Sequence, residues 1–237
     1  MKKIHELSDD KLVKLIDNRW ESSETLWQIV NKTYDANLKT YKNDPAWLAS
    51  LPRKKSKVRA NRIFVNVESV INSLISNPPK ITIIPGRDTP ESKRLAMLQE
   101  KYFQDKYTKR NVKEVLRKGL RNLYFGRLIV LKPYWDAKIN DFNVRAVNPK
   151  DIRFSKTSTK EDDSEFAIEE ISDNLAALLK RFPAKSKEIL THFGMENDDD
   201  VLVDNPEVKY LEAWCWDYTI FKLGNIILGK IRNPYWD

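Results

Sequence analysis

The sequence predicts an α+β fold in which long N-terminal helices precede mixed helices, antiparallel strands and hairpins. Residues 8–42 contain neither Gly nor Pro, and apolar residues recur there every three or four positions, as in one long helix or two in succession. From Gly126 onward the apolar residues alternate with polar ones, as at 142–146, which is typical of strands. With 41% hydrophobic residues, this 237-residue chain can build an ordinary buried core.

The first helical region has recognisable ends. Ser8 is an N-cap residue type, and two aspartates follow it at the positive end of the helix dipole. The stretch "NDPAW" at 43–47 ends the helix. We assign residues 1–50 to an N-terminal helical arm, 51–200 to an α/β region and 201–237 to a β-strand region. The final "IRNPYWD" resembles a strand end without a following helix or cap, so we expect this last region to be truncated at its C-terminal end.

The middle of the chain predicts three helices with one strand among them. A helical stripe of Phe64, Val67, Ile71 and Leu74 precedes "NPP", and proline cannot continue a helix. We expect "KITIIPG", 80–86, to form a strand followed by a turn. Thr89 and Pro90 are then the cap and first residue of a new helix, and a further helix runs to Gly126.

The second half of the chain predicts strands. "GRLIVLKPYWD" and "DFNVRAVNPKDIRF" are joined by "AKIN" and indicate a hairpin. After "FAIEEI", a short helical segment, "SDNLAALLKRF", is stopped by Pro183. The strongest strand pattern is "EVKYLEAWCWDYTIFK", in which Val208, Tyr210, Trp214 and Trp216 take one face, and "LGN" then turns the chain.

Charge and cysteine content limit the partners and the compartment. The formal net charge of +8 favours polyanionic neighbours, such as nucleic acid or acidic protein surfaces. Cys215 is the single cysteine, so no intramolecular disulfide and no cysteine-based zinc site can form, which suits a reducing compartment. Apolar runs such as "LIVL" are far shorter than the roughly 20 residues that span a bilayer, so we expect no membrane partner.

The sequence contains no recognisable catalytic pattern. The acidic stretches "EDDSE" and "NDDDVLVD" lack the spaced Asp, Asn and Gly residues of a calcium loop. His5 and His192 lie far apart, and neither "GxxxxGK" nor "GxGxxG" occurs. Cys215, between two tryptophans of a predicted strand, has the pattern of a buried core residue rather than a nucleophile. We therefore predict no catalytic residue, no metal site, no cofactor and no enzymatic activity.

Basic residues form two clusters in the first half of the chain, and acidic loops follow in the second half. Such clusters suit contact with nucleic acid or with a neighbouring subunit, and the uneven charge would suit a head-to-tail ring. Aromatic residues are not interleaved with them, so base stacking is not indicated. The candidate contact residues are Arg53, Lys54, Lys55, Lys57, Arg59 and Arg62 in the first cluster, and Lys109, Arg110, Lys113, Arg117, Lys118 and Arg121 in the second, beside Lys106.

The order of these features resembles that of the portal proteins of tailed double-stranded-DNA bacteriophages. The resemblance runs through "NRIFVNVESVINSLISNPPKITIIPG", a helical pair, "LRNLYFGRLIVLKPYWD", "FNVRAVNPKDIRF", a "KRFP" helix end and "VKYLEAWCWDYTIF". It covers roughly residues 60–237, and its order and spacing are more specific than any single piece. The resemblance implies the N-terminal portion of a portal subunit, mainly its mixed α/β wing region, so that 51–200 would be wing-like.

The resemblance also implies partners and a location. Portal subunits assemble into a ring, commonly of twelve copies, at one capsid vertex, beside the major capsid protein. Terminase drives double-stranded DNA through this channel during genome packaging, and the DNA leaves through tail or adaptor proteins during ejection. The ring catalyses nothing itself, belongs to the virion and is assembled in the host cytoplasm. No channel-lining or motor-contacting position can be matched in this sequence.

Two other functions are compatible with the sequence. A basic nucleic-acid-binding accessory protein, acting as a monomer or dimer, would bind DNA in a salt-dependent manner. A metal-dependent nuclease using the acidic loops would lose activity when Asp198, Asp199 and Asp200 are replaced.

Overall fold

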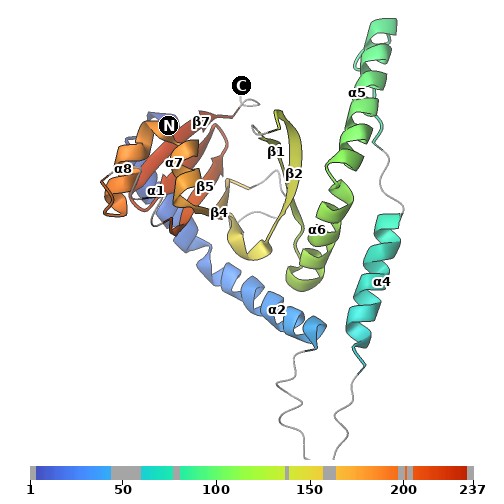
Figure 1. Ribbon diagram of the computed structural model, residues 1–237, viewed down its shortest axis with the longest axis horizontal. Coiled ribbons are helices and arrows are strands. Elements are labelled where there is room, and N and C mark those ends of the chain that lie inside the picture. Colours follow the sequence, from blue (N-terminus) through green and yellow to red (C-terminus); the bar gives the residue numbers. More distant parts are fainter. Residues whose placement is uncertain are drawn as a thin grey trace, which may run out of the picture. The chain divides into compact units, whose positions relative to one another are not determined.

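The computed structural model describes residues 4–43, 60–76, 81–136, 139–156, 164–196, 201 and 205–233. It confirms the predicted α+β class, with helices and antiparallel sheets (Figure 1). The chain divides into two compact units: unit 1 is Met1–Ile29 with Lys150–Asp237, and unit 2 is Val30–Pro149. Unit 1 is thus discontinuous in sequence, whereas the predicted regions 1–50, 51–200 and 201–237 are each continuous.

Unit 1 is built on a five-stranded antiparallel sheet in which every neighbouring pair of strands is also adjacent in the chain order. The strands are β3 (Ile152–Phe154), β4 (Phe166–Asn174), β5 (Glu207–Cys215), β6 (Tyr218–Leu223) and β7 (Ile226–Arg232). Gly224 lies in the tight turn between β6 and β7 and has a φ of 51°, a left-handed conformation that glycine adopts without strain. This turn confirms the one predicted at "LGN".

Helices cover both faces of this sheet, because alternate side chains of each strand point to opposite sides. On one face α1 (Asp9–Ser22) buries Leu12 and Ile16 against Ile168, Ala213 and other strand residues. On the other face α7 (Leu175–Arg181) and α8 (Ser186–His192) pack over β5, β6 and β7 (Figure 1). Unit 1 therefore has an apolar core on each side of the sheet.

Unit 2 consists of helices and one hairpin. The helices are α2 (Glu24–Lys42), which enters from unit 1, α4 (Arg62–Ser76), α5 (Pro90–Lys109) and α6 (Val112–Gly126). The predicted start of α5 is confirmed, because Thr89 Oγ1 accepts a hydrogen bond from the backbone N–H of Ser92 at 3.2 Å and Pro90 is the first helical residue. Strands β1 (Val130–Asp136) and β2 (Asp141–Val147) confirm the predicted hairpin.

Helix α6 packs closely against the residues that lead into the hairpin. A Cβ atom at Gly119 would lie 2.9 Å from Ile129 Cδ1, and one at Gly126 would lie 3.1 Å from the Tyr34 ring. Both approaches are too close for a larger side chain without movement of the neighbour. Two of the six glycines of the chain are therefore used to bring a helix against its neighbours.

Two strand predictions are wrong. Residues 81–85 have no regular secondary structure, and Ile84 is 86% exposed, because no other described strand offers a hydrogen-bonding edge there. The segment 207–222 forms two strands instead of one, since the chain turns at Trp216 and Asp217. The backbone N–H of Asn233 donates to the Asp217 carbonyl at 2.8 Å and so attaches this turn to the chain after β7.

Candidate functional site

The first predicted basic cluster lies almost entirely outside the described residues. Arg53, Lys54, Lys55, Lys57 and Arg59 belong to the segment 44–59, whereas Arg62 is the exposed first residue of α4. The structure therefore shows the position of one member of this cluster.

The second cluster lies on the last turn of α5 and along α6, and most of its members are paired with carboxylates. Lys106 and Arg110 both contact Asp141, and Arg121 contacts Glu68 at 2.8 Å. The pairs Lys109–Asp105 and Arg117–Glu114 lie within one helix each. A DNA phosphate would have to compete with these carboxylates for the same cations.

Lys113 and Lys118 are the members of the second cluster that remain exposed and make no ion pair with a described residue. Two lysines on one helix form a much smaller cationic surface than the seven residues that the sequence suggested. Because the salt-dependent part of DNA affinity grows with the number of phosphates neutralised, this arrangement gives limited support to direct DNA binding.

Asp141 contacts three side chains on successive turns at the end of α5, and the sequence did not indicate this contact. Its carboxylate accepts hydrogen bonds from Tyr102 Oη at 2.7 Å, from Lys106 Nζ and from Arg110 Nη2 at 2.7 Å. These donors are spaced four residues apart and so share one face at the end of α5. Lys106, together with Tyr102 and Arg110, holds the pKa of Asp141 well below its usual range. The start of β2 is thereby attached to the end of α5.

Replacing Asp141 with asparagine should loosen the end of α5. The side-chain NH₂ group of asparagine cannot accept the hydrogen bonds that Lys106 and Arg110 donate. We therefore expect the backbone N–H groups of residues 102–110 to exchange hydrogen at least about tenfold faster. Hydrogen exchange measured by mass spectrometry checks this. Asp105→Asn is the matched control, because it removes only the exposed Lys109–Asp105 pair and should have little effect. Equal exchange in the two variants would contradict the assigned role of Asp141.

A second, partly buried carboxylate joins three helices of unit 2. Glu68 of α4 accepts hydrogen bonds from Arg121 Nε and Nη2 of α6, each at 2.8 Å, and from Tyr41 Oη of α2 at 2.7 Å. The Arg121 guanidinium, with Tyr41, lowers the pKa of the Glu68 carboxyl from 4.5 to about 2. Glu68 is the one acidic residue of α4, whose other residues are apolar or uncharged apart from Arg62, and this isolation was the available sequence signal.

Apolar residues are distributed very unevenly between the two units. Of the 26 buried apolar residues among those described, 21 belong to unit 1. Of the 22 large apolar side chains that are exposed in the described part of the chain, 18 belong to unit 2, and 12 of these lie between Ile63 and Phe103. Unit 2 therefore presents apolar helix faces to its surroundings and has a much smaller core than unit 1.

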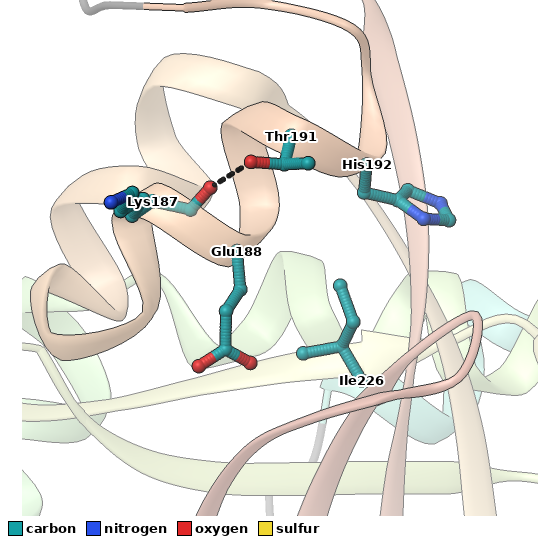
Figure 2. Close-up of a pocket in the computed structure, with 5 residues that line it drawn as sticks. All are labelled: Lys187, Glu188, Thr191, His192 and Ile226. Carbon is teal, nitrogen blue, oxygen red and sulfur yellow. Dashed lines mark hydrogen bonds between the residues drawn. The ribbon is translucent and has the colours of Figure 1, made fainter.

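An open depression of about 420 Å³ lies beside α8, lined by Lys187, Glu188, Thr191, His192 and Ile226 (Figure 2). Thr191 Oγ1 donates to the Lys187 carbonyl at 2.8 Å, and Glu188 is paired with Lys185 at 2.7 Å. Figure 2 shows the Glu188 carboxylate pointing away from the His192 ring, so the two do not form an acid–base pair.

Other reactive groups are placed as structural residues in the described part of the chain. Cys215 is buried in the α1-side core, as predicted, and burial raises the pKa of its thiol, which disfavours the reactive thiolate. No group of three or more His, Cys, Asp or Glu side chains among the described residues could hold a metal ion. Asp198, Asp199 and Asp200 lie outside these residues, and none of the described helices is long and apolar enough to cross a membrane.

Neither a protein-family model nor a curated protein matches this chain. The class that the structure defines is an α+β chain of two units, one with a complete core and one with exposed apolar helices.

Proposed function

We propose that this chain is a subunit of the portal ring of a tailed double-stranded-DNA bacteriophage, mainly of its wing region. The ring would form the DNA channel at the capsid vertex for genome packaging and ejection. Support for the portal class comes from the ordered sequence features between residues 60 and 237. Support for assembly comes from the exposed apolar side chains of unit 2.

The observation that carries the proposal is the exposed apolar surface of unit 2. Soluble monomers rarely expose large contiguous apolar surface, and obligate interfaces are apolar like a divided domain core. Unit 2 has 120 residues, nearly the same as unit 1, yet among the residues that the structure describes it contributes 5 of the 26 buried apolar side chains. Burial of its helices against further protein would supply the missing core.

The proposed role is structural, and its partners follow from the ring. Neighbouring copies and the major capsid protein would surround the subunit, terminase and tail or adaptor proteins would dock on the ring, and double-stranded DNA would pass through it. The subunit would act in the virion after assembly in the host cytoplasm. It would hold the channel without performing chemistry, because the motor hydrolyses the ATP.

Electron microscopy tests this proposal directly. We expect the purified product of the full reading frame that contains this chain to form rings with a central hole. A uniform monomer or dimer that binds a DNA duplex with steep salt dependence would contradict it and favour the accessory-protein alternative. The pairing of Lys106, Lys109, Arg110, Arg117 and Arg121 with carboxylates gives that alternative limited support from the second basic cluster.

A further inference from the structure

Strand β7 forms one edge of the unit 1 sheet, because it pairs with β6 and with no other described strand. The backbone N–H of Asn233 donates to the carbonyl of Asp217, which lies directly opposite it, so these two residues form a hydrogen-bonded pair. In an antiparallel ladder such pairs alternate with pairs whose backbone groups point away from each other. The register therefore gives Lys230 and Arg232 N–H and carbonyl groups that face outward from the sheet.

The outward-facing stretch of β7 is exposed. Lys230, Ile231 and Arg232 are all exposed, and Ile231 is 58% exposed. Among the described residues, no backbone group outside β6 forms a hydrogen bond with the backbone of Lys230 or Arg232. A row of unpaired backbone donors and acceptors is complementary to the backbone of another extended chain. This edge therefore identifies a peptide strand as its occupant.

The start of β7 has a feature that discourages pairing, and the end of β7 does not share it. The pairing of β6 with β7 is irregular between Phe221 and Lys222, and such bulges are one way in which proteins protect an edge. From Gly229 to Arg232 the register is regular. Lys230 is paired with Asp9 at 2.7 Å, whereas Arg232 makes no ion pair with a described residue. Arg232 is thus the cation that a carboxylate of an added strand can reach.

The two faces of β7 differ in character. A Cβ atom at Gly229 would lie 3.5 Å from the Phe182 ring, so this face of β7 is the one covered by α7 and α8. Ile231, two positions on, exposes its side chain on the same face. Ile226 also packs on this face and lines the depression beside α8, and Figure 2 shows its side chain pointing toward α8. The side chain of Arg232 lies on the opposite face, because successive side chains of a strand alternate.

We propose that the β7 edge binds an extended peptide segment of a partner protein, which adds to the sheet as a further strand. Its backbone pairs with that of Lys230 and Arg232, and a carboxylate beside Arg232 neutralises the guanidinium. On the other face, one apolar side chain covers Ile231 and another enters the depression beside Ile226. These two isoleucines are five positions apart, about 16 Å of extended chain, so the segment has about six residues.

This inference goes beyond the proposed function and does not depend on it, because a strand can add to the edge of a single subunit. The opposite edge of the sheet is a poorer template, since β3 (Ile152–Phe154) has three residues. The alternation of apolar and polar side chains in the added strand gives specificity, while its backbone gives most of the affinity.

Fluorescence anisotropy with the labelled synthetic peptide TVEVTVET tests the proposal on the 237-residue chain. Its valines would lie on the α8 face and its polar residues on the face of Arg232. Antiparallel addition pairs Lys230 and Arg232 with peptide residues on their own face, so we expect saturable binding that weakens at least about fivefold when the polar residues are N-methylated. N-methylation of the valines is the matched control, because their N–H groups would face solvent.

Variants of β7 test the same contact from the side of the protein. Lys230→Pro removes an outward N–H at an edge, where proline is tolerated, and should weaken binding at least about fivefold. Lys230→Gln is its control, because it removes the charge but keeps the N–H, and should bind within about twofold of wild type. Arg232→Gln should weaken binding of TVEVTVET and leave that of TVQVTVQT unchanged. Circular dichroism verifies that each variant is folded.

The N-methylated peptides keep the test valid if a variant fails to fold, since they are used with the wild-type chain. Loss of binding with only the valines N-methylated would support strand addition in the parallel direction. Equal binding of both N-methylated peptides, or no binding of the unmodified peptide at millimolar concentration, would overturn the proposal.

Sedimentation velocity without peptide examines a second copy as the occupant. Self-association that Lys230→Pro abolishes would assign the edge to another copy of this chain and overturn the partner peptide. Ring formation by the full reading frame is a separate result. Rings whose subunits do not bind the peptide would leave the proposed function in place and overturn only this inference.

Discussion

Replacing Glu68 with glutamine is expected to lower the free energy of unfolding by about 1–3 kcal/mol. The carboxylate accepts three hydrogen bonds, two from Arg121 and one from Tyr41, and so connects α2, α4 and α6. Glutamine has one acceptor oxygen and would present an N–H group to a guanidinium that can only donate. Since unit 2 has a small apolar core, this loss removes a large part of what holds its helices together.

The same carboxylate makes unit 2 sensitive to acid. The pKa of Glu68 is lowered to about 2 in the folded chain from an ordinary 4.5. A lowered folded-state pKa adds stability that is complete above the unfolded value and is lost as the pH falls through the folded value. The contribution of Glu68 should therefore disappear between about pH 4.5 and pH 2, and Glu68→Gln should lack this part of the acid response.

Thermal unfolding followed by far-ultraviolet circular dichroism, at a series of pH values, measures both effects. Asp88→Asn is a suitable control because it removes an ion pair with Lys93 in which both side chains are more than half exposed. Exposed pairs contribute little, so this variant should behave like the wild type within about 0.5 kcal/mol. Acid profiles of Glu68→Gln and wild type that superimpose would show that Glu68 is not a stabilising residue.

Replacing Leu178 with alanine is expected to have the largest effect on unit 1, about 2–5 kcal/mol. Leu178 of α7 is fully buried in the cluster that includes Tyr210, Phe221 and Leu228. Truncation to alanine leaves a cavity that the packed side chains on this face of the sheet can fill only partly. The lost burial of the removed carbon atoms and the cost of the cavity therefore both lower the free energy of unfolding. The effect should appear mainly as unfolding of unit 1.

Denaturant titration followed by tryptophan fluorescence measures this change, since five of the seven tryptophans belong to unit 1. Leu26→Ala provides the matched control, because the same truncation is made where the side chain is 44% exposed. That control should stay within about 0.5 kcal/mol of wild type. A similar loss in both variants would mean that α7 does not cover the sheet as described.

Local structure was predictable wherever it depends on neighbours in sequence. The apolar period of 8–42 correctly indicated helices, and the Thr89–Pro90 pair correctly located a helix start. The hairpin of β1 and β2 followed from two alternating runs and a short connection. The wrong strand at 80–86 shows the limit of this approach, because a strand also needs a partner edge that local sequence does not report.

The candidate site was less predictable, because it depends on contacts between distant residues. Arg121 and Glu68 are 53 positions apart, and Lys106 and Asp141 are 35 apart. A basic cluster in the sequence does not reveal which carboxylates the fold will bring beside it. Helix α4 is more apolar than α1, yet Leu74 of α4 is 55% exposed while Leu12 of α1 is buried, so the apolar pattern of a helix does not reveal which of its side chains the fold covers.

The sequence by itself determined the α+β class, most of the helices and turns, the single buried cysteine and the separation of basic from acidic segments. These features depend on periodicity, side-chain type and charge, which need no tertiary context. The tertiary structure alone decided that helices cover both faces of the unit 1 sheet and that Asp141 and Glu68 pair with Lys106, Arg110 and Arg121 of the second basic cluster. It also decided that apolar side chains of the unit 2 helices remain exposed. The reason is that burial and charge pairing are properties of residues brought together from distant parts of the chain.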